Sequence, residues 1–255
     1  MDPVLKVRDV CLSYHTLSGE TPALSHISFD LMPGEFLSVV GPSGCGKSTL
    51  LNLIAGLIEP ECGSIILDGK AVCGNSSTVG YMLQKDHLLE WRSIYKNILL
   101  GLEIRGQLTP DKLAHAEELL HTYGLDRFRN SRPSQLSGGM RQRAALIRTL
   151  VLEPELLLLD EPFSALDYQT RLNVSDDIGK ILKSSGNPAI LVTHDISEAI
   201  SMADRVLVLS ARPATVQKVV DIHLTLENRT PLSSRNAPDF KKYFNLIWKE
   251  LNENA

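Results

Sequence analysis

Four short hydrophobic runs divide the chain, at residues 36–40, 156–159, 190–193 and 205–209. Each is rich in leucine or β-branched residues and lacks the polar alternation of a half-exposed strand. Continuous apolar runs of this length are typical of strands that are buried on both faces, as in a parallel sheet covered by helices. The pattern therefore predicts an α/β core.

Three other apolar runs, at residues 5–10, 65–67 and 78–82, are shorter and are separated by turn sequences such as Asp68-Gly69. Short strands bounded by glycine turns are typical of antiparallel pairing. We expect these runs to form an antiparallel β layer beside the main sheet, so that the fold class is α/β with a mixed β-sheet core.

The pattern changes to helical between residues 84 and 154. Thr109 and Pro110 provide a capping side chain and a first-turn proline, and Gly124 provides a helix stop. Because the buried strands resume at residue 156, we interpret residues 86–154 as a helical subdomain inserted in a domain spanning residues 1–233. The apolar face of the capped helix comprises Leu113, Ala116, Leu120 and Tyr123.

Residues 234–255 are expected to form a C-terminal amphipathic helix. Packing of this helix on the core is the favoured interpretation, and docking of a partner is the alternative. The apolar stripe comprises Phe240, Tyr243, Phe244, Ile247, Trp248 and Leu251.

A glycine-rich segment between the first buried run and a following apolar helix matches the pattern G-x-x-x-x-G-K-[ST]. Glycines let backbone N–H groups turn toward phosphates, and the helix N-terminus favours anions. Lys47 is expected to reach the β- and γ-phosphates, and the Ser48 hydroxyl to bind Mg²⁺. The predicted nucleotide-binding loop comprises Gly41, Pro42, Ser43, Gly44, Cys45, Gly46, Lys47, Ser48 and Thr49.

The second buried run ends in two carboxylates, Asp160 and Glu161. Asp160 is expected to hold Mg²⁺, directly or through water, and Glu161 to polarise an attacking water as general base. Two acids after a strand could instead cap the next helix, and in isolation that interpretation would be preferred. The upstream nucleotide loop favours the catalytic one.

Together these motifs resemble the ATP-binding cassette (ABC) ATPases. Walker A lies at 41–49, the signature at 136–140, Walker B at 156–161, and Ser164-Ala165-Leu166-Asp167 follows. The resemblance extends from about Tyr14 to His194. It implies an ATPase that requires ATP and Mg²⁺.

The family implies roles for four further residues. Tyr14 resembles the aromatic that stacks on adenine, and Gln84 the Q-loop residue that senses Mg²⁺ and the transport partner. His194 resembles the switch histidine at the γ-phosphate, and Asp167 is expected at the seam of a dimer. Alone, Tyr14 or His194 would be interpreted as structural.

The resemblance also implies a head-to-tail homodimer, in which the signature of one copy closes over the ATP held by Lys47 of the other. In isolation, Ser-Gly-Gly would be a flexible turn before a helix. The expected signature residues are Leu136, Ser137, Gly138, Gly139 and Met140.

Composition excludes several classes of function. The 255 residues are 43% hydrophobic with a formal net charge of -4, which does not favour a nucleic-acid binder. The N-terminal residues lack the pattern of a signal peptide, and no run of about 18 apolar residues indicates a membrane span. Without paired or metal-ligand spacing, the four cysteines are expected to be reduced, as in a cytosolic protein. They are Cys11, Cys45, Cys62 and Cys73.

Residues 85–92, 136–143, 211–213 and 238–240 resemble the ATPases of nitrate, sulfonate and taurine importers, although Glu90 and Ala214 depart from that group. The resemblance implies an ATPase peripheral to the cytoplasmic side of the cell membrane. Its expected partners are a separate integral membrane permease and, indirectly, a solute-binding protein. An exporter ATPase or a non-transport ABC protein is the alternative.

Overall fold

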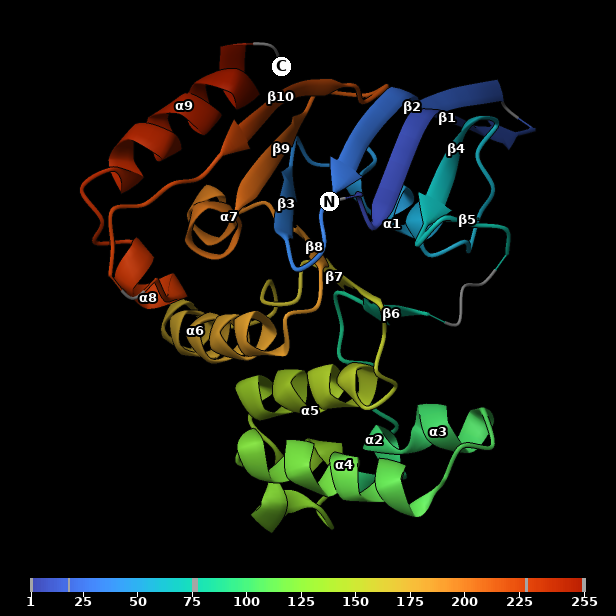
Figure 1. Cartoon of the computed structure of the whole chain (residues 1–255), viewed down its shortest axis with the longest axis vertical. Coiled ribbons are helices and arrows are strands. Elements are labelled where there is room, and N and C mark those ends of the chain that lie inside the picture. Colours follow the sequence, from blue (N-terminus) through green and yellow to red (C-terminus); the bar gives the residue numbers. More distant parts are fainter. Residues whose placement is uncertain (1, 18, 75–77, 228, 254–255) are drawn as a thin grey trace.

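The computed structural model describes residues 2–17, 19–74, 78–227 and 229–253. Within these residues the strands form two sheets (Figure 1). The smaller sheet is antiparallel and contains the predicted strands at 5–10 and 65–67. Its order is β2-β1-β4-β5, with β1 (Leu5–Thr16), β2 (Gly19–Leu31), β4 (Cys62–Leu67) and β5 (Lys70–Ala71).

The larger sheet contains all four continuous apolar runs, which form adjacent strands as predicted. The strands are parallel except β10, which pairs antiparallel with β9 at the edge. The order is β10-β9-β3-β8-β7-β6, with β3 (Phe36–Val40), β6 (Val79–Met82), β7 (Leu156–Asp160), β8 (Ala189–Val192), β9 (Arg205–Leu209) and β10 (Val216–Asp221).

The assignment of residues 78–82 to the antiparallel layer is wrong. Strand β6 pairs parallel with β7, with Val79 opposite Leu156 and Met82 opposite Leu159. As the last strand of the large sheet, β6 buries Gly80 and Met82 but leaves Val79 half-buried. This alternation, produced by an edge position, resembles that of an antiparallel strand.

Strand β7 is buried on both faces, which explains its unbroken leucine run. Leu156 and Leu158 belong to a hydrophobic cluster with β1, β2 and α1 (Lys47–Ile54). Leu157 and Leu159 belong to a second cluster with α5 (Gly138–Leu150) and α6 (Tyr168–Ser185). Each fully buried leucine stabilises the fold by about 1.5–3 kcal/mol. Because successive side chains point to opposite faces of β7, this one strand contributes to both hydrophobic clusters.

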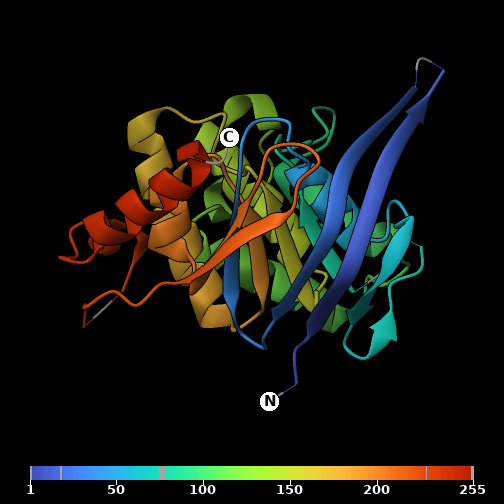
Figure 2. The same cartoon turned by 90° about the horizontal axis from the view of Figure 1, so that it is seen from above.

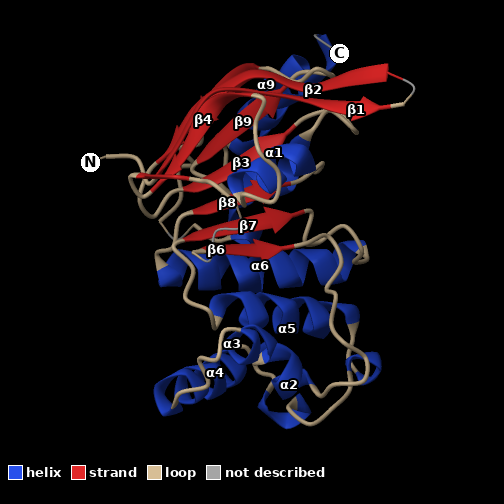
Figure 3. Cartoon of the chain, turned by 90° about the vertical axis from the view of Figure 1, so that its right-hand side faces the viewer, coloured by secondary structure: helices blue, strands red, loops and turns tan. Residues whose placement is uncertain are grey.

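A helical lobe between β6 and β7 extends away from the sheets, and its helix α5 contacts both β6 and α6 (Figure 3). The helices are α2 (Ile94–Ile98), α3 (Leu100–Ile104), α4 (Pro110–Thr122) and α5 (Gly138–Leu150) in the lobe, then α6 (Tyr168–Ser185), α7 (Ile196–Met202), α8 (Pro231–Ser234) and α9 (Phe240–Glu253).

The predicted start and stop of α4 are confirmed. The Thr109 side chain accepts a hydrogen bond from the Lys112 backbone N–H, and Pro110 occupies the first turn. Gly124, just beyond the helix, has a φ of 67°, in the left-handed region that favours glycine. Local capping therefore defines this helix before tertiary packing is considered.

The C-terminal helix packs on the core through the predicted stripe. Ile247 is fully buried in a cluster with α7 and β9, whereas Trp248 is 55% exposed and stacks on Phe244. Tyr243 Oη donates to the His223 carbonyl and accepts from the His223 N–H, which fixes the preceding segment. Seen from above, α9 lies across the molecule from β1 and β2 (Figure 2).

The expectation that all four cysteines are reduced is wrong. Cys11 on β1 lies opposite Cys62 on β4, and the two form a disulfide across a sequence separation of 51 residues. Cys45 is buried and Cys73 exposed, both as free thiols. The pairing arises from strand register, and sequence spacing carries no trace of it.

Candidate functional site

The glycine-rich loop connects the end of β3 to the start of α1. Gly44 and Gly46 have φ values of 73° and 121°, which side-chain-bearing residues rarely adopt. A Cβ at Gly46 would lie 2.8 Å from Leu24 Cδ2, so only glycine fits beneath β2. The loop therefore reaches the N-terminus of α1 in a conformation that suits anion binding.

A cavity of about 230 Å³ lies against this loop. It joins the loop to the end of β7 and to the segment after β9. Its lining residues are Ser43, Gly44, Gly46, Lys47, Ser48, Thr49, Glu161 and Arg212.

Lys47 is buried against its own loop. Its Nζ donates to the carbonyl oxygens of Gly41 and Pro42, both at 2.9 Å. Burial raises the pKa of the neighbouring Cys45 thiol, an effect that the positive charge of Lys47 partly opposes. The loop thiol is therefore held neutral and has a structural position, whereas the Lys47 ammonium borders the cavity.

Asp160 is only 8% exposed at the end of β7. Burial raises the pKa of its carboxyl, while a hydrogen bond with Ser48 and the charge of Lys47 oppose the rise. The fold thus places a carboxylate and a hydroxyl side by side next to the loop. Both are hard oxygen donors, which suit a divalent cation such as Mg²⁺.

The side chain of Glu161 contacts two residues that follow other strands of the large sheet. Its Oε2 lies 3.0 Å from His194 Nδ1 and accepts from Gln84 Nε2 at 3.4 Å. Gln84 Nε2 also donates to Ser164 Oγ at 3.3 Å. Because Gln84, Glu161 and His194 follow the parallel strands β6, β7 and β8, the carboxyl edge of the sheet gathers them.

The backbone of Glu161 is itself unusual. Its φ is 45°, in the left-handed region that non-glycine residues avoid. Such strain at a side chain that faces a cavity is typical of functional sites. Glu161 lines the cavity together with the loop residues.

Tyr14 lies beside the last residue of the loop. Its side chain on β1 is 42% exposed, and its Oη is 3.0 Å from Thr49 Oγ1. An exposed aromatic ring at this position offers a surface for stacking.

The predicted signature and dimer-seam residues lie outside this chain's own cavity. Ser137 is the N-cap of α5 and accepts from the Met140 N–H, and both Ser137 and Gly138 are exposed. Asp167 is the exposed N-cap of α6, where hydrogen bonds from Thr170 lower the pKa of its carboxyl. These segments are therefore available to a second molecule.

Arg212 lines the cavity, although no sequence motif predicted it as a site residue. It lies in the segment between β9 and β10, and the sequence marked residues 211–213 only by resemblance to a group of importers. An arginine in a loop far from every nucleotide motif gives no spacing signal, so only the folded chain places it here.

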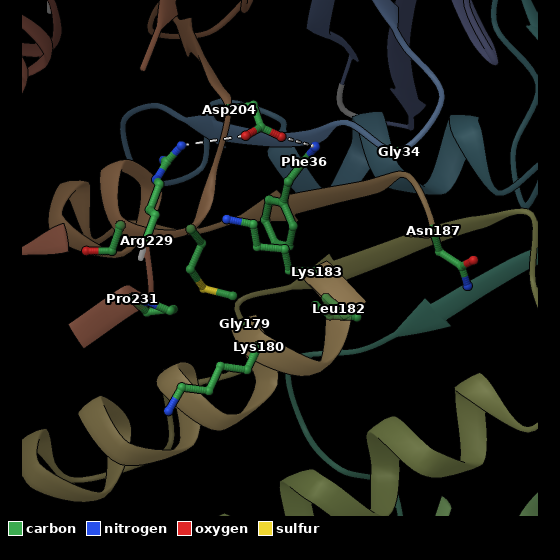
Figure 4. A pocket seen from close by; sticks show the side chains of 12 residues that line it. Gly34, Phe36, Gly179, Lys180, Leu182, Lys183, Asn187, Asp204, Arg229 and Pro231 are labelled. Atoms are coloured by element: carbon green, nitrogen blue, oxygen red, sulfur yellow. Dashed lines mark hydrogen bonds and ion pairs between the residues drawn. The ribbon is translucent and has the colours of Figure 1, made fainter. Parts of the chain in front are cut away.

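A larger cavity, of about 510 Å³, lies elsewhere, between β3, α6 and α7 (Figure 4). Arg229 there donates to the carbonyl oxygens of Ile200 and Ala203, and Asp204 accepts from the Phe36 N–H. None of the predicted site residues lines it. Arg229 and Asp204 therefore tie the C-terminal segment to α7 and β3, which is a structural role.

In the described part of the chain, no helix combines the length and the apolar character needed to span a membrane.

The fold and the site define a class of protein: a nucleotide-binding ATPase with a phosphate loop and converging acidic, amide and imidazole side chains at one sheet edge. Residues 24–164 match the ABC transporter family. The uncharacterized ABC transporter ATP-binding protein YtlC of Bacillus subtilis is 47% identical over 97% of this chain and 95% of its own length.

The aliphatic sulfonates import ATP-binding protein SsuB of Bacillus cereus is 37% identical over 93% of this chain and 92% of its own length. A dimeric, post-hydrolysis structure of the ATP-binding cassette MJ0796 with ADP and Pi matches with a TM-score of 0.73 and 29% identity. The match covers 86% of this chain and 99% of that one. The chain therefore belongs to the ABC transporter family. It is the ATP-binding subunit of an ABC transporter, and it is an ATPase.

Proposed function

We propose that this chain powers the uptake of a small solute of the nitrate, sulfonate or taurine class. It works as a head-to-tail pair on the cytoplasmic side of the membrane. There it binds separate permease subunits, to which a solute-binding protein delivers the solute. The convergence of Gln84, Glu161 and His194 on the loop cavity supports hydrolysis. The similarity to SsuB supports import of a sulfonate-like solute.

In this proposal the loop and α1 N-terminus bind the phosphates of ATP, and Tyr14 stacks on the adenine. Lys47 exchanges its contacts with Gly41 and Pro42 for phosphate oxygens when the nucleotide enters. Phosphate oxygens carry a negative charge that carbonyl oxygens lack, so the Lys47 ammonium is attracted more strongly to them and the exchange favours the bound state.

The oxygen donors of Ser48, Asp160 and Gln84 fit Mg²⁺, which supplies positive charge that offsets the charge of the phosphates. Burial of Asp160 supports this assignment, because a desolvated carboxylate gains most from a nearby cation. Glu161 then accepts a proton from the attacking water. His194 holds the Glu161 carboxylate in position from one side and Gln84 from the other.

The exposed start of α5 supports a composite site. Leu136 anchors the signature in the core, while Ser137 and Gly138 face outward from the N-terminus of the helix. In a head-to-tail pair, that N-terminus points its N–H groups at the ATP held by the other copy. The dimer of MJ0796 is a solved precedent for two cassettes packed together.

Apolar side chains between β6 and the helical lobe support a permease-docking surface. Leu83, Trp91 and Ile104 are 43%, 73% and 77% exposed. A hollow of about 210 Å³ includes Ile104 in its lining, together with residues of β6, α3 and α5. Arg148 on α5 donates to the carbonyls of Asp86 and His87. These hydrogen bonds hold the segment that follows Gln84 against α5. Motion of a bound permease helix would therefore reach the catalytic residues.

Trp91→Ala is expected to reduce solute uptake at least about tenfold while leaving the basal ATPase rate within about twofold of wild type. Large aromatic side chains dominate interface energetics, and the exposed Trp91 ring makes little contribution to the core. Uptake and ATP hydrolysis are measured in membrane vesicles that contain the whole complex. Trp248→Ala, an exposed tryptophan on α9, is the matched control, and equal uptake by both variants would contradict the docking surface.

Membrane fractionation tests the transport function against the alternatives. Association that disappears when the permease is deleted supports transport, whereas co-sedimentation with ribosomes or DNA would support a non-transport ABC protein. Vesicle assays with ATP on the cytoplasmic side then give the direction, since net extrusion would indicate an exporter.

A further inference from the structure

Two cations line the nucleotide cavity, Lys47 and Arg212. They come from distant parts of the sequence: Lys47 from the loop before α1, and Arg212 from the turn between β9 and β10. Glu161 is the only carboxylate among the described lining residues. Of the two cations that line this small cavity, only Lys47 belongs to a recognised nucleotide motif.

Backbone hydrogen bonds hold the turn that contains Arg212 against β2. Ala214 donates to the Ala23 carbonyl and accepts from the Ser25 N–H, both at 2.9 Å. The adjoining Leu24 packs against Gly46, where an added Cβ would collide with its side chain. Strand β2 therefore links the Arg212 turn to the phosphate loop, so that Arg212 is presented to the cavity from a fixed backbone.

The Arg212 side chain is free to bind a ligand. It is exposed, and in the described part of the chain it forms no hydrogen bond or ion pair. Lys47, in contrast, already donates to two loop carbonyls. The positive charge of Arg212 also acts to lower the pKa of the Cys45 thiol inside the loop, although burial raises that pKa overall.

We propose that Arg212 is a second phosphate-binding cation of the ATP site. Its guanidinium contacts the phosphate chain of the nucleotide that the loop holds. This inference rests on the proposed binding of ATP phosphates by residues 41–49. A guanidinium presents N–H donors and a positive charge to phosphate oxygens, and a lysine at the same position would keep the charge.

A surface arginine with no binding role is the competing explanation, and it makes different predictions. Solvation would then satisfy Arg212 equally with and without ATP, so its removal would not alter affinity. A phosphate contact must weaken when the charge is removed. The loss of affinity caused by removing the charge must also be smaller at high salt, because salt screens the interaction.

Arg212→Gln is expected to raise the Kd for MgATP about tenfold at low salt, with a smaller effect at high salt. Arg212→Lys should restore the affinity to within about threefold of wild type, because the charge is retained. Arg127→Gln, at an exposed arginine of the helical lobe, is the matched control and should bind as wild type does. Binding is measured by calorimetry on the purified chain, and thermal unfolding without nucleotide checks that each variant is folded.

Wild-type affinity in Arg212→Gln, or an Arg212→Lys variant no better than Arg212→Gln, would overturn the assignment. Lys47→Ala separates this result from a failure of the proposed site. If Lys47→Ala binds weakly and Arg212→Gln binds normally, the loop binds phosphates and Arg212 does not. If Lys47→Ala also binds like wild type, the proposed phosphate site itself is wrong.

Discussion

Glu161→Gln lowers the steady-state ATPase rate by about 10²- to 10⁴-fold and leaves MgATP affinity within about twofold of wild type; this is the expected result if Glu161 is the general base. General-base catalysis contributes this range of rate, and an amide cannot accept the proton of the attacking water. The substitution preserves the shape of the side chain, so the contact with His194 changes little in geometry. Turnover is measured by phosphate release and affinity by calorimetry.

The same variant is expected to accumulate as an ATP-bound dimer, because the closed state persists when hydrolysis stops. Size-exclusion chromatography with MgATP detects it. Glu59→Gln, at an exposed glutamate, is the matched control and should be monomeric or dimeric to the same extent as wild type. A normal hydrolysis rate in Glu161→Gln would show that another group activates the water.

Lys47→Ala is the second variant with a large expected effect, a loss of MgATP affinity of about 10- to 150-fold. The loss corresponds to a hydrogen bond with a charged group, about 1.5–3 kcal/mol. Lys47 also donates to the Gly41 and Pro42 carbonyls, so its removal leaves two loop acceptors without their donor. Calorimetry with MgATP gives the affinity, and the thermal midpoint without nucleotide reports any loosening of the loop.

Lys70→Ala removes an exposed lysine from β5 and serves as the control for charge alone. Equal affinities for Lys47→Ala, Lys70→Ala and wild type would exclude Lys47 from phosphate binding. Glu161→Gln and Lys47→Ala are complementary, because the first separates binding from turnover and the second removes binding itself. A result in which Glu161→Gln loses binding and Lys47→Ala keeps it would reverse the proposed roles.

Much of the architecture was predictable because local physics determines it. The runs at 36–40 and 156–159 are too apolar and too short for anything but buried strands, and they are β3 and β7. Thr109 and Pro110 start α4 through hydrogen bonds made within one turn. Gly44 and Gly46 give the loop backbone angles that other residues rarely adopt.

The errors arose where pairing between distant segments decides the outcome. Residues 78–82 belong to the parallel sheet because β6 pairs with β7, and the pattern of the run itself does not show which strand it pairs with. Cys11 and Cys62 became partners because β1 and β4 align in antiparallel register. Spacing in the sequence does not determine which strands are neighbours.

The sequence by itself determined the family, the phosphate loop and the positions of the acidic, amide and imidazole side chains, because each depends on a short motif with a local conformation. Only the tertiary structure decided that Gln84, Glu161 and His194 touch and that Arg212 shares the cavity with Lys47. The physical reason is the parallel sheet. It aligns the carboxyl ends of strands that are far apart in sequence, and β2 holds the turn after β9 against the loop.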